Sequence, residues 1–90
     1  MNIHQLIEEN KEQFYQDLNE VIKIKSVKGT PEKAAPFGRG PKEVLEKALS
    51  LSKSYGFETS SVQDAVGYAQ WGKDSEYIGI VGHLDVVPEG

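Results

Sequence analysis

The hydrophobic positions divide the chain into two amphipathic helical parts and an extended part that follows them. In the first part, apolar residues recur close to every 3.6 positions with Glu, Lys, Gln and Asn between them, which indicates a helix over about residues 2–25. Asn2 can cap its first turn, and the apolar stripe is expected to pack against a core. The stripe comprises Ile3, Leu6, Ile7, Phe14, Leu18, Val21 and Ile22.

Residues 26–41 are predicted to form a long loop, because they contain three prolines and three glycines. Arg39 is expected there as a solvated side chain. A second helix is predicted over residues 42–55. Pro41 would take its first helical position, and Gly56 would take the left-handed position just beyond its end. The apolar face of this helix comprises Val44, Leu45, Ala48 and Leu49.

Residues 57–87 are predicted to hold three strands. The first two cover about residues 57–62 and 65–71, and residues 72–75 carry a turn signal that is expected to join the second and third strands as a hairpin. Residues 77–81 are continuously apolar apart from one glycine, as in a strand that is covered on both faces. The element order predicts an α/β fold with two N-terminal helices followed by three strands.

Composition excludes several classes of protein. The chain has 90 residues, a formal net charge of -4 and no cysteine. The acidic balance argues against nucleic-acid binding, and the lack of cysteine excludes a disulfide scaffold and favours a cytoplasmic location. No apolar run is long enough to span a membrane, so no membrane partner is expected. So short a chain buries little surface on folding. The apolar run 77–81 has the pattern of a strand that is covered on both faces, but only two helices are predicted to cover it. We therefore expect the chain to be part of a larger domain.

The candidate chemistry lies directly after the apolar run, at His83 and Asp85. Ligands of α/β sheets bind beyond the carboxyl ends of the strands, and residues two apart in an extended chain point to the same side. Imidazole is a good zinc ligand, and a carboxylate often accepts the proton of its second nitrogen. The pattern therefore makes His83 a candidate zinc ligand and Asp85 the group that orients it.

Spacing alone leaves the alternative open that His83 is a structural, hydrogen-bonded histidine. A catalytic zinc site needs about three protein ligands, and no other residue shows ligand spacing. His4 is expected to face solvent without a metal role, and Glu8, Glu9 and Glu12 are more simply a solvated helix face near its positive end.

The residues from Ile80 to Gly90, IVGHLDVVPEG, resemble the first metal-binding motif of the co-catalytic zinc aminoacylase, carboxypeptidase and dipeptidase superfamily. The nearest resemblance is to bacterial PepV-like (Xaa-His) dipeptidases. It rests also on the N-terminal helix, the loop PFGRGP over residues 36–41, the helix that ends at Gly56-Phe57, and Gly67-Tyr68 leading to Trp71-Gly72.

The resemblance implies that residues 1–90 are the N-terminal part of a zinc-peptidase catalytic domain, whose other ligands, general base and lid domain come later. In that family His83 would bind one of two zinc ions and Asp85 would be the catalytic acidic residue that orients it. The parent would hydrolyse dipeptides, while the 90-residue piece would be inactive and bind zinc weakly.

Two other functions stay open: an N-acyl amino acid deacylase or desuccinylase of the same superfamily, and a non-enzymatic α/β interaction module with a structural His83. The piece is also expected to self-associate through its uncovered strand, because exposed strand edges pair with other chains.

Overall fold

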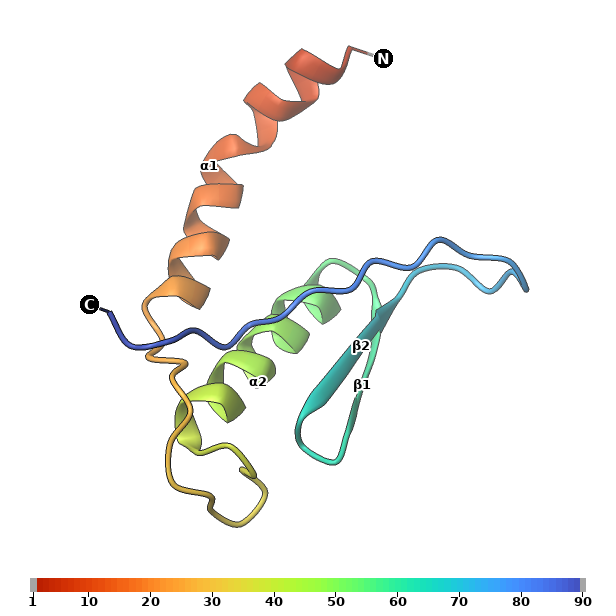
Figure 1. Ribbon diagram of the computed structural model, residues 1–90. Coiled ribbons are helices and arrows are strands. Elements are labelled where there is room, and N and C mark those ends of the chain that lie inside the picture. Colours follow the sequence, from red (N-terminus) through yellow and green to blue (C-terminus); the bar gives the residue numbers. More distant parts are fainter. Residues whose placement is uncertain (1, 90) are drawn as a thin grey trace.

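The computed structural model describes residues 2–89 and contains two helices and one hairpin (Figure 1). The elements follow in the order α1 (Ile3–Ile22), α2 (Arg39–Ser54), β1 (Glu58–Val62) and β2 (Val66–Gln70). The α/β class and the two helices are therefore confirmed. None of the helices in the described part is long and apolar enough to cross a bilayer.

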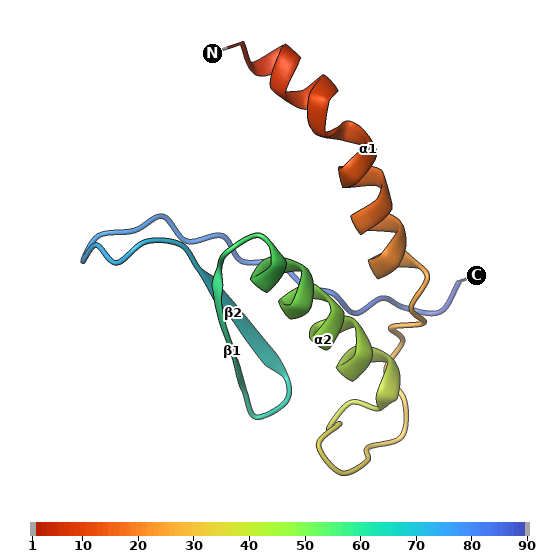
Figure 2. The same ribbon diagram turned by 180° about the vertical axis from the view of Figure 1, so that it is seen from behind.

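Helix α1 begins and ends within three residues of its predicted bounds, but its apolar stripe is uncovered. The Asn2 side chain accepts hydrogen bonds from the backbone N–H groups of His4 (2.9 Å) and Gln5 (3.4 Å), which caps the first turn. No residue of α1 is buried, and the helix projects away from the rest of the molecule in both views (Figures 1 and 2). The expected packing against a core is absent within residues 2–89, because only α2 lies against α1 and only near its carboxyl end.

Polar side chains hold α1 to α2. The Tyr55 hydroxyl, just after α2, donates to the Asp17 carboxylate, and Lys47 lies 3.5 Å from Glu20. The hydrogen bond to Asp17, with some desolvation, raises the pKa of Tyr55 above its usual value. A raised pKa means that this contact is fully present below the ordinary tyrosine pKa of about 10 and is lost as the pH rises through the raised value.

We therefore expect α1 to move away from α2 at alkaline pH. A dye on Glu12→Cys, with Trp71 as the fluorescence donor, should show energy transfer that falls above about pH 10. The same chain with Tyr55→Phe should show low transfer already at pH 8 and little change above it. An identical alkaline fall in both chains would show that Tyr55 does not control the contact.

The connection from residue 23 to residue 38 contains no helix or strand. A backbone hydrogen bond closes a loop within it, between residues 29 and 37. The N–H of Gly29 donates to the Phe37 carbonyl oxygen at 2.8 Å. Gly38 has a φ of 97°, and a Cβ there would lie 2.8 Å from the Gly29 Cα. Both the left-handed conformation and the close approach therefore require glycine at residue 38.

Helix α2 begins at Arg39, three residues before the predicted range and two residues before Pro41. Gly38 is its N-cap and Arg39 its first residue, so Pro41 is the third residue of the helix and not the first. The backbone fits, because none of the first four N–H groups of a helix has an intrahelical partner and proline costs nothing there. Arg39 is exposed, as expected, but on the helix and 3.5 Å from the Glu32 carboxylate.

The carboxyl end of α2 is as predicted. Gly56 follows the C-cap residue Tyr55 with a φ of 92°. Its N–H donates to the Lys53 carbonyl oxygen at 3.0 Å, and the N–H of Phe57 donates to that of Ser52 at 3.1 Å. These two bonds are the pair that closes a helix with a left-handed glycine and turns the chain back toward the helix.

The hairpin packs its second strand closely on α2. β1 and β2 are antiparallel, with Glu58 opposite Gln70 and Val62 opposite Val66. A Cβ on Gly67 would lie 2.8 Å from the Leu45 Cδ1 atom and 2.9 Å from the Leu49 Cδ2 atom. Leu45 lies at this contact, and the buried apolar residues of the described chain are Ala35, Val44 and Leu45.

The predicted position of the hairpin was wrong. Its turn is formed by residues 63–65, between the first two strands, and not by residues 72–75. Gln63 and Asp64 both take positive φ angles, 54° and 55°, which is the twist that tight hairpin turns need. The Lys42 ammonium group, 2.6 Å from the Asp64 carboxylate, fixes the turn to α2.

The third predicted strand does not form. Residues 77–85 are extended, but they join no sheet, and in this part of the chain only Val86 makes a bridge, a parallel one to Val27. Ile78, Ile80 and Val81 are 94–98% exposed. An apolar run of this kind forms a strand when a neighbouring strand pairs with it and other elements cover both of its faces. Residues 2–89 provide neither at this position.

Candidate functional site

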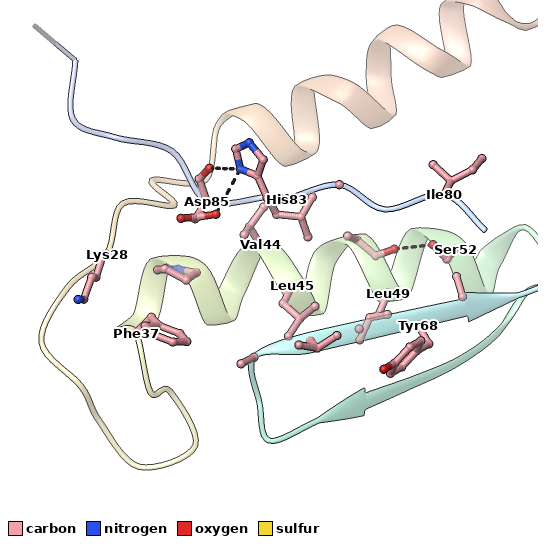
Figure 3. A pocket seen from close by; sticks show the side chains of 18 residues that line it. Lys28, Phe37, Val44, Leu45, Leu49, Ser52, Tyr68, Ile80, His83 and Asp85 are labelled. Atoms are coloured by element: carbon pink, nitrogen blue, oxygen red, sulfur yellow. Dashed lines mark hydrogen bonds and ion pairs between the residues drawn. The ribbon is translucent and has the colours of Figure 1, made fainter.

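His83 and Asp85 lie together on the extended segment that crosses α2 (Figure 3). The His83 Nδ1 atom is 2.9 Å from the backbone carbonyl oxygen of Asp85 and 3.3 Å from its carboxylate Oδ1 atom. The extended backbone from 83 to 85 thus brings the two side chains to the same side, as their spacing predicted.

The contacts of His83 determine which of its nitrogens is free. A carbonyl oxygen can only accept, so the hydrogen bond to it requires the proton on Nδ1. In the neutral ring this leaves the Nε2 atom with its lone pair, and Nε2 takes part in neither contact. The side chains of His83 and Asp85 are 81% and 65% exposed, so this nitrogen is accessible to a ligand. The imidazole is therefore held in the form that a metal binds.

The described residues fit one part of a zinc site and not a whole one. Zinc takes three or four protein ligands, drawn from His, Cys, Asp and Glu side chains. Within residues 2–89 no group of three such side chains is placed to hold a metal ion. His83 can contribute one ligand with Asp85 behind it, and further ligands would have to come from outside this part of the chain.

One backbone anchor holds the His83–Asp85 segment. The Val86 N–H donates to the Ser26 carbonyl oxygen at 3.1 Å, next to the Val27–Val86 bridge. Ser26 is 4% exposed and is buried under the start of α2. There a Cβ on Gly40 would lie 1.9 Å from the Lys25 carbonyl oxygen and 3.2 Å from the Ser26 Cα. Sequence reasoning missed this anchor, because a glycine in a loop-like stretch reads as a turn signal and not as a site of close packing.

Gly40→Ala should therefore detach the His83–Asp85 segment from Ser26. The added methyl group cannot share space with a backbone oxygen, so residues 25–26 must move and the bond from Val86 is expected to break. Amide hydrogen exchange at Val86 should rise to the rate of an unprotected amide. Gly79→Ala is the matched control, because nothing lies within 4 Å of a Cβ there, and it should leave Val86 unchanged. Equal exchange in the two variants would contradict this packing account.

A groove of about 610 Å³ lies beside the pair, between β2 and residues 80–85, with α2 as its floor (Figure 3). The floor is apolar and includes Val44, Leu45 and Leu49, while His83 and Asp85 line one wall. Lys28 also lines the groove. The candidate site is thus an exposed rim beside an apolar groove.

The chain is similar to proteins that are named as dipeptidases. It is 35% identical to the Beta-Ala-Xaa dipeptidase of Lactobacillus delbrueckii over 92 aligned positions, which take in all of this chain and 20% of that enzyme. Proteins from Bacillus subtilis and Staphylococcus epidermidis whose names contain the word dipeptidase are 35% and 36% identical, over 89% and 91% of this chain. The chain spans about a fifth of the length of these relatives, and no family model matches it.

Proposed function

We propose that residues 1–90 are the N-terminal part of a zinc-dependent dipeptidase of the PepV-like type. One observation carries the proposal: the His83 ring is held through Nδ1 by Asp85, so that Nε2 is free to bind a metal. The names of the relatives support dipeptides as substrates over N-acyl or N-succinyl amino acids.

In this proposal the chain's own share of the chemistry is to hold one metal ligand. The backbone carbonyl oxygen of Asp85 fixes the tautomer of the His83 ring, and the negative charge of the Asp85 carboxylate, 3.3 Å from Nδ1, makes Nε2 a better ligand for a metal ion. Zinc, when bound, would polarise the peptide carbonyl and lower the pKa of a bound water. The remaining ligands and the general base would be supplied by the longer polypeptide that the relatives' length indicates.

The groove gives the motif a setting suited to a small substrate. His83 and Asp85 stand on its rim, and its apolar floor on α2 can exclude water from one side of a bound peptide. Exclusion of water strengthens the electrostatic interactions of a metal site. We propose that Arg39, the first residue of α2, does not bind the carboxylate of a dipeptide, because its side chain is paired with Glu32.

A chimera tests the proposal. Residues 1–90 would replace the matched fifth of the Lactobacillus Beta-Ala-Xaa dipeptidase, so that the rest of that enzyme completes the site. We expect the purified chimera to hydrolyse dipeptides, to lose activity on chelation and to regain it on addition of zinc. A folded chimera that is inactive with zinc, or that is fully active after chelation, would contradict the proposal.

A further inference from the structure

The segment PFGRGP, residues 36–41, leads into α2, and both of its glycines contact the same stretch of backbone, residues 25–29. A Cβ on Gly40 would lie 1.9 Å from the Lys25 carbonyl oxygen. A Cβ on Gly38 would lie 2.8 Å from the Gly29 Cα and 2.9 Å from the Gly29 nitrogen. The two ends of the 25–29 stretch are therefore held against the start of α2 by backbone contacts that leave no room for a side chain.

The middle of the same stretch binds the segment that carries His83. The Ser26 carbonyl oxygen accepts the hydrogen bond from the Val86 N–H at 3.1 Å, and Val27 forms the parallel bridge to Val86. Both ribbon views show this crossing of the two chain segments just beyond α1 (Figures 1 and 2). Among the described residues, this bridge is the one backbone pairing that joins residues 77–89 to the rest of the chain.

The bridge determines on which side of the segment His83 lies. Side chains alternate along an extended chain, so a shift of the pairing by one residue would turn both His83 and Asp85 to the opposite side. The contacts of the His83 ring are with Asp85 on the same segment, so they move with the segment and do not fix its place. The position of His83 relative to α2 therefore depends on residues 26 and 27.

We infer that Gly38 and Gly40 are positioning residues for His83. By admitting the 25–29 backbone close to α2, they fix the bridge to Val86 and, through it, the place of the His83 Nε2 atom. The base of this arrangement is held in turn, because Val44 of α2 is 1% exposed and Lys42 is paired with Asp64 of the hairpin turn. The inference rests on the proposed function, in which His83 binds zinc, and a functional ligand must be held within about 0.5 Å of its productive position.

The start of α2 does not by itself explain both glycines. Gly38, the N-cap, has a φ of 97° and a ψ of 175°, a conformation that is essentially restricted to glycine. Gly40 differs, because it lies within α2 and is not among the glycines with a positive φ. Alanine would favour the helix at residue 40. The approach of Lys25 and Ser26 is what requires glycine there, since a Cβ would also lie 3.2 Å from the Ser26 Cα.

Zinc affinity of the chimera, measured by competition with a chromogenic chelator, tests the inference. We expect Gly40→Ala to weaken zinc binding about 10–100-fold, the usual loss when the support of a metal ligand is removed. Gly67→Ala is the matched control, because its Cβ would crowd Leu45 and Leu49 without touching residues 25–29. It should lower the thermal stability but leave the zinc affinity unchanged. Wild-type affinity in folded Gly40→Ala, or an equal loss in Gly67→Ala, would overturn the inference.

A second pair of variants tests the other end of the stretch and decides the question if Gly40→Ala does not fold. Gly38→Ala is compared with Gly29→Ala, whose Cβ would lie at an ordinary 3.9 Å from the Gly38 Cα. Cobalt(II) replaces zinc in the chimera, because its visible absorption reports the arrangement of its ligands. We expect Gly38→Ala to change the spectrum and Gly29→Ala to preserve it. Identical spectra in both variants and the wild type would overturn the inference.

These results separate the inference from the proposed function. A wild-type chimera that binds no zinc would contradict the proposed function and the positioning role together. A wild-type chimera that binds zinc, with the same affinity in Gly38→Ala and Gly40→Ala, would overturn the positioning role alone.

Discussion

Replacing His83 by alanine in the chimera is expected to lower kcat for dipeptide hydrolysis by about 10³-fold or more. The alanine removes one metal ligand, and a catalytic metal supplies several kcal/mol of transition-state stabilisation, of which each 1.36 kcal/mol is a factor of ten. Purified variants would be compared by initial rates with zinc in the buffer, and circular dichroism would establish that the variant is folded.

Two matched variants make this result specific. His4→Ala removes the other histidine of the chain, which lies exposed at the start of α1 and has no proposed role as a metal ligand. This variant should leave kcat unchanged. Asp85→Asn keeps the shape but removes the charge behind the ring, so we expect an intermediate loss of about 10–100-fold. A folded His83→Ala chimera with unchanged activity would refute the metal-ligand role.

The 90-residue chain by itself is expected to hydrolyse no dipeptide above the rate of buffer with zinc. Residues 2–89 place no third metal-binding side chain near His83 and Asp85. One imidazole and one carboxylate on an exposed segment give neither a closed coordination sphere nor a general base.

The measurement is an overnight dipeptide hydrolysis assay with excess zinc, together with a calorimetric zinc titration. We expect no product and only weak binding, which His83→Ala reduces further. Zinc-dependent hydrolysis by the pure chain would show that it completes a site without the rest of the relatives' length.

The helices could be predicted from the sequence because their signals are local. Asn2 caps α1 and Gly56 ends α2 through contacts with residues at most four positions away, so a single sequence contains both partners. The start of α2 was predicted three residues late, because proline is allowed at several positions of a first turn and Pro41 is the third residue of the helix.

The strands were predicted less well because strand pairing depends on partners that the local pattern does not show. Gln63 and Asp64 carry the hairpin turn, although neither is glycine, and a distant side chain, Lys42, holds it. Gly72 does take a positive φ of 86°, but no paired strand follows it. The apolar pattern of residues 77–81 predicts a strand that is covered on both faces, but residues 2–89 provide neither a paired strand nor a cover at this position.

The candidate pair was predictable because a two-residue spacing in an extended chain fixes the side on which both side chains lie. The structure adds the contacts of Nδ1, which the sequence could not give. The anchor from Val86 to Ser26 under Gly40 joins positions more than fifty residues apart, so no local signal announced it.

The most direct test of the account is the zinc content of the purified chimera with and without His83. After dialysis against metal-free buffer, elemental analysis should find zinc bound to the chimera and to its His4→Ala variant, and clearly less in His83→Ala. The same zinc content in all three proteins, at equal folded fraction, would contradict the claim that His83 is a metal ligand.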